Sequence, residues 1–118
     1  MRHIIHRHTQ SFGHAWRGVL HALRTQPNFV IHLVISTCAL LLGYMVNISI
    51  IENILIIFVI MGGLAIELLN TAIEEACNAI DSTFREEIKI AKDAAAGAML
   101  IYAIGAIIIA ALIFLPKL

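Results

Sequence analysis

Polar side chains recur along an otherwise apolar stretch at a spacing that would let them act on one substrate. They are Glu67, Asn70, Thr71 and Glu74, followed by Asn78. At 3.6 residues per turn the first four fall within an arc of about 100° on a helix, so they face one site. One carboxylate could accept a proton from a hydroxyl, and another could hold Mg²⁺ beside phosphate oxygens. The stripe therefore predicts proton transfer and cation binding on one helix face.

The depth of each carboxylate follows from the membrane that this helix must cross. If the helix enters the lipid near Ile50, Glu67 lies roughly 25 Å along it, close to the cytosolic edge of the hydrocarbon. Glu74 lies about 10 Å further out, so one residue could meet a lipid headgroup and the other, with Glu75, a nucleotide phosphate. An ionisable group at membrane depth is costly unless it faces a bundle interior, which makes Glu67 the leading functional candidate. The alternative is a structural ion pair with Lys92 or Arg24.

A Lys92-Asp93 pair opens the last apolar stretch of the chain. Lys92 could bind a polyphosphate as a point charge and Asp93 could orient it, although such charges also simply mark the membrane interface. The sequence contains neither a P-loop nor a protein-kinase signature. An ATP site would therefore depend on carboxylates that hold a divalent cation.

The composition explains why the solvent must be lipid. Of 118 residues, 60% are apolar and 14% are charged, which exceeds what a soluble fold of this size can bury. The formal net charge is zero, so no nucleic-acid partner is expected. Pro27 should break the chain after a surface helix anchored by Trp16, and Asn28 could cap the next helix.

We expect an all-α integral membrane protein that forms a single domain over residues 1–118, with an N-terminal amphipathic surface helix and three transmembrane helices. The predicted segments are a flexible basic tail at 1–9, a surface helix at 10–25, and membrane helices at 29–46, 50–80 and 88–115. Seven of the eight basic residues lie in the N-terminal segment or between Arg85 and Lys92. The positive-inside rule therefore places the N-terminus and the second loop in the cytosol.

The two polar blocks together resemble the prokaryotic diacylglycerol kinase and undecaprenol kinase family, from about Ser11 to Leu115. The family's E-[IL]-[LV]-N-[ST]-A-I-E is matched at residues 67–74, and its A-K-D-x-[AG]-[AS]-[AG]-A at residues 91–98. The resemblance implies an ATP-dependent lipid kinase of the bacterial inner membrane that uses Mg²⁺. It also implies a homotrimer whose sites are shared between neighbouring subunits.

The resemblance also assigns residue roles. Glu67 is expected to take the proton from the lipid hydroxyl with Asn70 in support, and Glu74 is expected to hold the metal bound to ATP. Further nucleotide contacts are expected at Arg7, His14, Arg17, Gln26, Thr83, Arg85, Lys92 and Asp93. Lipid contacts are expected at Glu67, Trp16 and Ala96.

One family position differs in this chain. Members usually carry a metal-binding Glu just after the surface helix, where this sequence has Gln26. An amide oxygen is a poorer Mg²⁺ ligand than a carboxylate, so metal affinity should fall unless Glu75 compensates. Asn78 likewise replaces an acid that is common in the family.

Two lipid alcohols fit this interpretation, undecaprenol and diacylglycerol. Residues 95–97 and His32 resemble the undecaprenol kinases more closely. A catalytically silent oligomeric scaffold or pore is the main rival, since the acids at positions 26 and 78 are missing. A proton-coupled transporter is a weaker alternative, because the polar stripe leaves no path across the outer half of the membrane.

Overall fold

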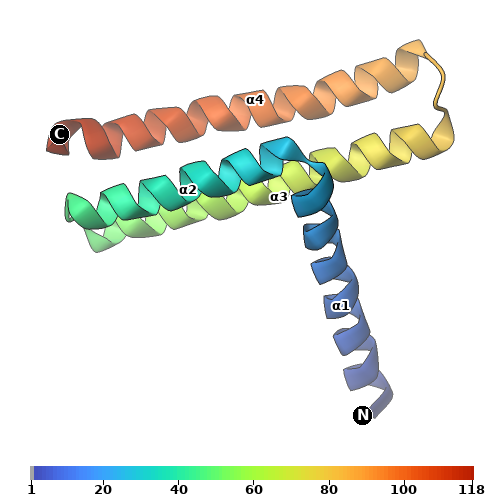
Figure 1. Cartoon of the computed structure of the whole chain (residues 1–118), viewed down its shortest axis with the longest axis horizontal. Coiled ribbons are helices and arrows are strands. Elements are labelled where there is room, and N and C mark those ends of the chain that lie inside the picture. The colour runs from blue at the N-terminus through green and yellow to red at the C-terminus, as the bar shows by residue number, and fades with distance from the viewer. Residues whose placement is uncertain (1) are drawn as a thin grey trace.

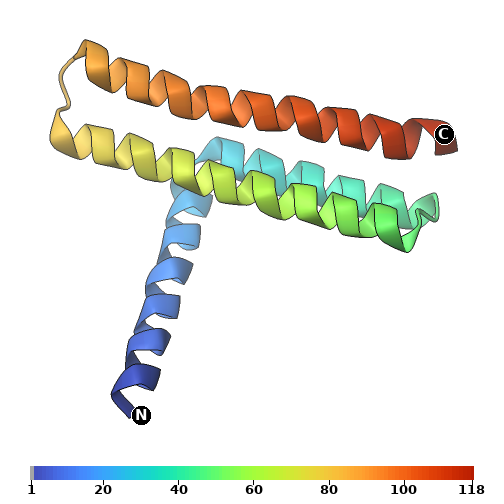
Figure 2. The same cartoon turned by 180° about the vertical axis from the view of Figure 1, so that it is seen from behind.

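The computed structural model describes residues 2–118, with side chains from Gln10 onward. It contains four α-helices and one short 3₁₀ helix, which are α1 (Arg2–Thr25), α2 (Pro27–Met45), α3 (Ile50–Ile80), α4 (Glu86–Phe114) and η1 (Leu115–Lys117). Helices α2, α3 and α4 run alongside one another, and α1 projects crosswise from the start of α2, beside a part of α3 that lies short of the α3–α4 loop (Figures 1 and 2). No strand occurs between residues 2 and 118, which confirms the all-α prediction.

Three helical segments are long and apolar enough to cross a membrane, which are Pro27–Met45, Ile50–Ile80 and Glu86–Lys117. Large apolar side chains cover their outer faces, with Phe58 75% exposed and Ile101 75% exposed. Water would not solvate such continuous apolar surface, whereas lipid would. The chain is therefore a multi-pass membrane protein.

The boundaries of three helices differ from the predicted 10–25, 29–46 and 88–115. Helix α1 begins at Arg2, so the tail predicted over residues 1–9 is helical from its second residue. No glycine or proline precedes Gly13, and each residue added to an existing helix gains a backbone hydrogen bond. Helix α2 begins at Pro27, with Gln26 in extended geometry (φ −112°, ψ 102°) as its N-cap, so Asn28 lies inside the helix and does not cap it. Helix α4 begins at Glu86 and ends at Phe114.

The corner between α1 and α2 forms where the sequence predicts it. Pro27 occupies the first helical position, where its missing N–H donor costs nothing. Ala22 of α1 and Phe29 of α2 are both buried at this corner, at 0% and 3% exposed. Apolar packing therefore fixes the direction in which α1 leaves the bundle.

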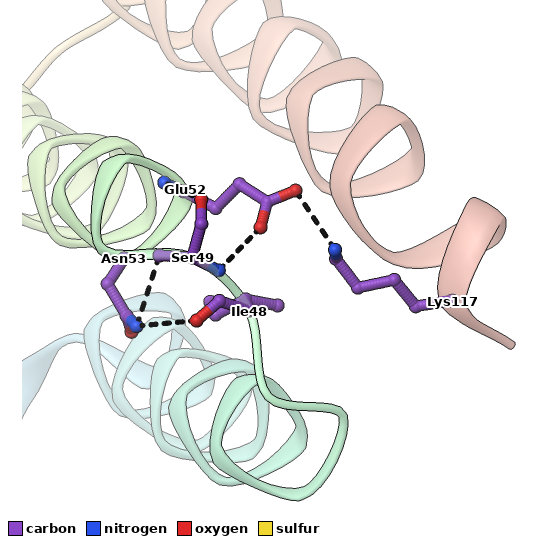
Figure 3. Close-up of polar contacts among 5 residues, drawn as sticks. All are labelled: Ile48, Ser49, Glu52, Asn53 and Lys117. Atoms are coloured by element: carbon purple, nitrogen blue, oxygen red, sulfur yellow. Dashed lines mark hydrogen bonds and ion pairs between the residues drawn. The ribbon is translucent and has the colours of Figure 1, made fainter.

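At the opposite end of the bundle, polar side chains join the α2–α3 turn to residues near the C-terminus, next to a small apolar core. The Ser49 hydroxyl accepts from the Glu52 N–H (3.2 Å), and the Glu52 carboxylate accepts from the Ser49 N–H (2.7 Å), which is a capping box at the start of α3. The Lys117 ammonium lies 3.3 Å from the same carboxylate, so the chain's last residues are tied to the α2–α3 turn (Figure 3). The core beneath consists of Ile48, Ile56, Ile113 and Phe114.

Helix α3 is the central element, because it packs against both α2 and α4. It approaches α4 closely where the Tyr102 hydroxyl donates to the Val59 carbonyl at 2.5 Å. Gly62 makes room for this ring, since a Cβ there would collide with the Tyr102 oxygen and lie 2.9 Å from Cζ. The α3–α4 spacing in the middle of the membrane therefore depends on a glycine facing a tyrosine.

Gly62→Ala should destabilise the bundle by about 1–3 kcal/mol, because the added methyl group must displace Tyr102 and weaken its bond to Val59. Thermal unfolding in detergent micelles measures the change. Gly18→Ala on α1 is the matched control, since nothing lies within 4 Å of a Cβ at that position. Equal stability of the two variants would show that the α3–α4 contact is loose.

Candidate functional site

The Glu67 side chain is the most deeply buried ionisable group of α3. It is 2% exposed, and its Oε1 atom has no hydrogen-bond partner among residues 10–118. It lies on the floor of a cavity of about 340 Å³ between α2 and α4. The polar and small side chains around this cavity are Asn28, His32, Asn70, Ala96 and Ala103. A buried carboxylate without a partner is costly, so the cavity is suited to a ligand that brings a hydrogen-bond donor.

The polar side chains along α3 differ in whether they have hydrogen-bond partners. The Thr71 hydroxyl donates to the Glu67 backbone carbonyl at 2.9 Å, so Thr71 is satisfied within its own helix. The Asn70 amide donates to the Glu74 carboxylate at 3.5 Å, and its own Oδ1 atom is buried without a partner in the described part of the chain. Asn70 therefore lies between Glu67 and Glu74 along the helix, where it bonds Glu74 and borders the cavity.

Lys92 and Asp93 lie about one helical turn before Ala96, which borders the cavity. They belong to the part of α4 that follows the α3–α4 loop. The Lys92 ammonium donates to Asn78 Oδ1 at 2.7 Å, which joins α4 to α3. Asp93 pairs with Lys89 at 2.7 Å on the exposed face of α4. Lys92 is therefore bonded to Asn78 and not to Glu67, so the structural ion pair considered for Glu67 is absent from the described residues.

Helix α1 meets α3 through His21, whose Nε2 atom lies 3.4 Å from the Glu75 carboxylate. Further along α1, the Arg17 guanidinium bonds His14 Nδ1 at 2.9 Å and the Gly13 carbonyl at 3.3 Å. His14 and Arg17 are therefore held to each other on an exposed face. Trp16 is 56% exposed beside them, as expected of a membrane anchor. The predicted contact at Arg7 lies outside the side chains that the structure describes.

The loop between α3 and α4 is organised locally. The Asp81 carboxylate accepts from the Thr83 N–H (2.8 Å) and the Thr83 hydroxyl (2.6 Å), and these bonds lower the pKa of Asp81. Arg85 lies 4.0 Å from Asp81 and 3.9 Å from Glu87. Thr83 and Arg85 thus pair with residues of the loop and of the first turn of α4, and neither bonds Glu67 or Glu74 in this chain.

The predicted metal ligands are Glu74 and Gln26. Glu74 is half-buried at the outer end of the stripe, and the half-buried Gln26 side chain makes no capping bond to α2. Residues 10–118 contain no group of three or more His, Cys, Asp or Glu side chains placed to hold a metal ion. The Mg²⁺ site predicted from the sequence therefore stays a prediction.

The tertiary structure thus unites only part of the predicted site. Glu67, Asn70 and Ala96 border one cavity, Glu74 is joined to them through Asn70, and Lys92 and Asp93 follow on α4. The contacts predicted on α1 and in the α3–α4 loop lie on other parts of the surface. His32 borders the cavity without having been assigned a role in the site; the sequence singled it out only as a polar residue in an apolar span and as a point of resemblance to the undecaprenol kinases.

Comparisons with known proteins agree on one family. A family model described as prokaryotic diacylglycerol kinase matches residues 13–114. The chain is 45% identical over 118 residues to undecaprenol kinase of Bacillus subtilis, which covers 99% of this chain and 95% of that protein. It is 36% identical over 109 residues to diacylglycerol kinase of Synechocystis sp., which covers 92% of this chain and 62% of that longer protein.

Glu67→Met should raise the stability of the fold by about 1–3 kcal/mol, because it removes a buried carboxylate that lacks a partner and leaves a side chain that suits an apolar environment. Thermal unfolding in micelles without nucleotide or lipid tests this. Glu86→Met, at an exposed position in the first turn of α4, is the matched control and should change stability little. A destabilised Glu67→Met would mean that the carboxylate holds the helices together.

Proposed function

The chain belongs to the prokaryotic diacylglycerol kinase family and is a lipid kinase, and we propose that it transfers the γ-phosphoryl group of ATP to undecaprenol at the cytosolic face of the bacterial inner membrane. The observation that carries this proposal is the buried, unpartnered Glu67 carboxylate in a cavity between membrane helices. The near full-length similarity to an undecaprenol kinase favours undecaprenol as acceptor. Diacylglycerol is the second candidate, because the other relative is named for it.

In the proposed reaction Glu67 is the general base. Its free Oε1 atom accepts the proton of the lipid hydroxyl as the alcohol oxygen forms a bond to the γ-phosphorus. The bond between that phosphorus and the β–γ bridging oxygen breaks, which yields a lipid phosphate and ADP. Burial among membrane helices keeps water from competing with the alcohol for the phosphoryl group.

The neighbouring polar residues would position the nucleotide. Glu74, oriented by Asn70, would hold the Mg²⁺ ion that neutralises phosphate charge when it is bound with ATP. Lys92 would exchange its bond to Asn78 for a phosphate oxygen, a contact in which an ammonium acts as a point charge. Asp93 would orient the nucleotide from the next position of α4.

Orientation and assembly complete the proposal. The basic residues near α1 and the α3–α4 loop favour a cytosolic N-terminus by the positive-inside rule. A homotrimer with shared sites would place α1 of one subunit near α3 of another. That assembly accounts for His14 and Arg17, which are expected to bind nucleotide and yet lie away from Glu67 in the single chain.

Glu67→Gln should abolish phosphoryl transfer while leaving the fold intact, because the amide keeps the shape of the side chain and cannot accept the proton. The measurement is transfer of labelled γ-phosphate from ATP to undecaprenol and to diacylglycerol, run side by side in mixed micelles. Glu86→Gln provides the same chemical change at an exposed position and should retain full activity.

The labelling assay distinguishes the two candidate lipids, tests the role of Glu67 and separates a kinase from a silent scaffold. Labelling of undecaprenol above diacylglycerol supports the proposed acceptor, whereas preferential labelling of diacylglycerol reverses the choice of substrate and keeps the kinase. Substantial activity in Glu67→Gln contradicts the general-base role. Labelling of neither lipid, with no saturable ATP binding, would favour the catalytically silent scaffold.

Gln26→Glu should lower the Mg²⁺ concentration needed for half-maximal activity several-fold, because a carboxylate is a better ligand for this ion than an amide oxygen. The rate is measured against free Mg²⁺ at saturating ATP and lipid. Gln10→Glu adds the same charge elsewhere on the exposed surface of α1 and controls for a general electrostatic effect. An equal response of the two variants would place position 26 outside the metal site.

A further inference from the structure

A second cavity continues from the Glu67 cavity into the middle of the bundle. It measures about 240 Å³ and lies between α2 and α4 over α3. Its lining is aliphatic or glycine except for His32, Ser36 and Tyr102. The two cavities share His32, Ile35 and Ala103, so they form one groove that is polar at Glu67 and apolar further in.

His32 stands at the junction of these two cavities. A Cβ built on Gly63 would lie 3.4 Å from His32 Nδ1 and 3.7 Å from its Cε1, so the ring lies against the α3 backbone at Gly63. Gly63 precedes Glu67 by four residues, which places it on the same helix face, about 6 Å along the axis. The imidazole and the carboxylate therefore border one cavity about one helical turn apart.

Neither group is bonded to a neighbouring side chain. His32 makes no hydrogen bond to any side chain among residues 10–118, and Glu67 Oε1 likewise has no partner there. Polar groups at membrane depth are costly without a partner, and an apolar side chain would fill the space beside Gly63 at lower cost. Two unpartnered groups that face one cavity point to a single ligand atom that both can reach.

We propose that His32 binds the acceptor hydroxyl of the lipid opposite Glu67. A neutral imidazole offers one N–H donor, which would bond the hydroxyl oxygen while the hydroxyl donates its proton to Glu67. The carbon chain attached to that hydroxyl then lies in the apolar cavity beyond His32. Two bonds fix the orientation of the oxygen and leave its remaining lone pair directed out of the groove, toward the nucleotide.

This inference rests on the proposed function and deepens it by naming a second residue that holds the acceptor. A role in packing alone is the alternative, because the ring also fills space against Gly63. Binding of the hydroxyl and packing against Gly63 predict different effects of a substitution at His32 on substrate binding. Loss of a bond to the hydroxyl weakens binding of the lipid and not of ATP, whereas loss of packing disturbs the bundle and both substrates together.

The test compares His32→Leu, His32→Gln and Thr37→Ala in the mixed-micelle assay with undecaprenol as acceptor. His32→Leu should raise the KM for the lipid about tenfold, the size expected from losing one hydrogen bond, with the KM for ATP unchanged. His32→Gln, which restores a donor, should recover most of the loss. Thr37→Ala, at an exposed position of α2 that lines neither cavity, should behave as the wild type.

Two results would overturn the inference. One is an unchanged lipid KM in a folded His32→Leu protein, and the other is an equal loss for lipid and ATP that His32→Gln does not repair. Thermal unfolding of each variant establishes whether it is folded. A wild-type protein that phosphorylates neither undecaprenol nor diacylglycerol would instead refute the proposed function, so the two failures are distinguishable.

Discussion

The burial of the Glu67 carboxylate among membrane helices is the constraint on which the rest of the structure depends. A carboxylate in an apolar environment normally needs a cation or several donors, and residues 10–118 supply none to its Oε1 atom. The fold must therefore provide enough stability elsewhere to keep this group in place. In the proposed reaction, an incoming hydroxyl would meet an acceptor that is already buried between the helices, which is an arrangement that favours proton transfer.

That stability comes from contacts on either side of the site, and most involve α3. At the far end the Ser49–Glu52 capping box and Lys117 fasten the α2–α3 turn to the C-terminus. In the middle, the Tyr102–Val59 bond over Gly62 sets the distance between α3 and α4. These contacts hold α3 in place while α2 and α4 lie on either side of it. The two cavities that α2, α3 and α4 enclose therefore stay unfilled. The same helix thus carries the buried Glu67 carboxylate and contributes the contacts that hold α2 and α4 beside its cavity.

Several features were predictable because they depend on local sequence. The limits of α3 agree with the predicted 50–80, since apolar composition and the loop at residue 81 bracket it. The break at Pro27 follows from proline's missing donor, while the N-cap at Gln26 was missed because the cap carries no side-chain bond that its residue type would announce. The start of α1 at Arg2 was missed for a related reason. Charge and histidine content suggested a solvated tail, and nothing in those residues prevents a helix from extending through them.

The division between sequence and tertiary structure follows from how far each interaction reaches along the chain. By itself the sequence determined the membrane environment, the number of helices and the polar stripe at Glu67, Asn70 and Glu74, because hydropathy and the 3.6-residue period act within one helix. Only the folded chain decided that Lys92 bonds Asn78 and leaves Glu67 unpaired, and that His32 of α2 borders the same cavity as Glu67 of α3. These pairings join residues on separate helices, and their geometry depends on side-chain packing at the helix contacts, for which local periodicity holds no information.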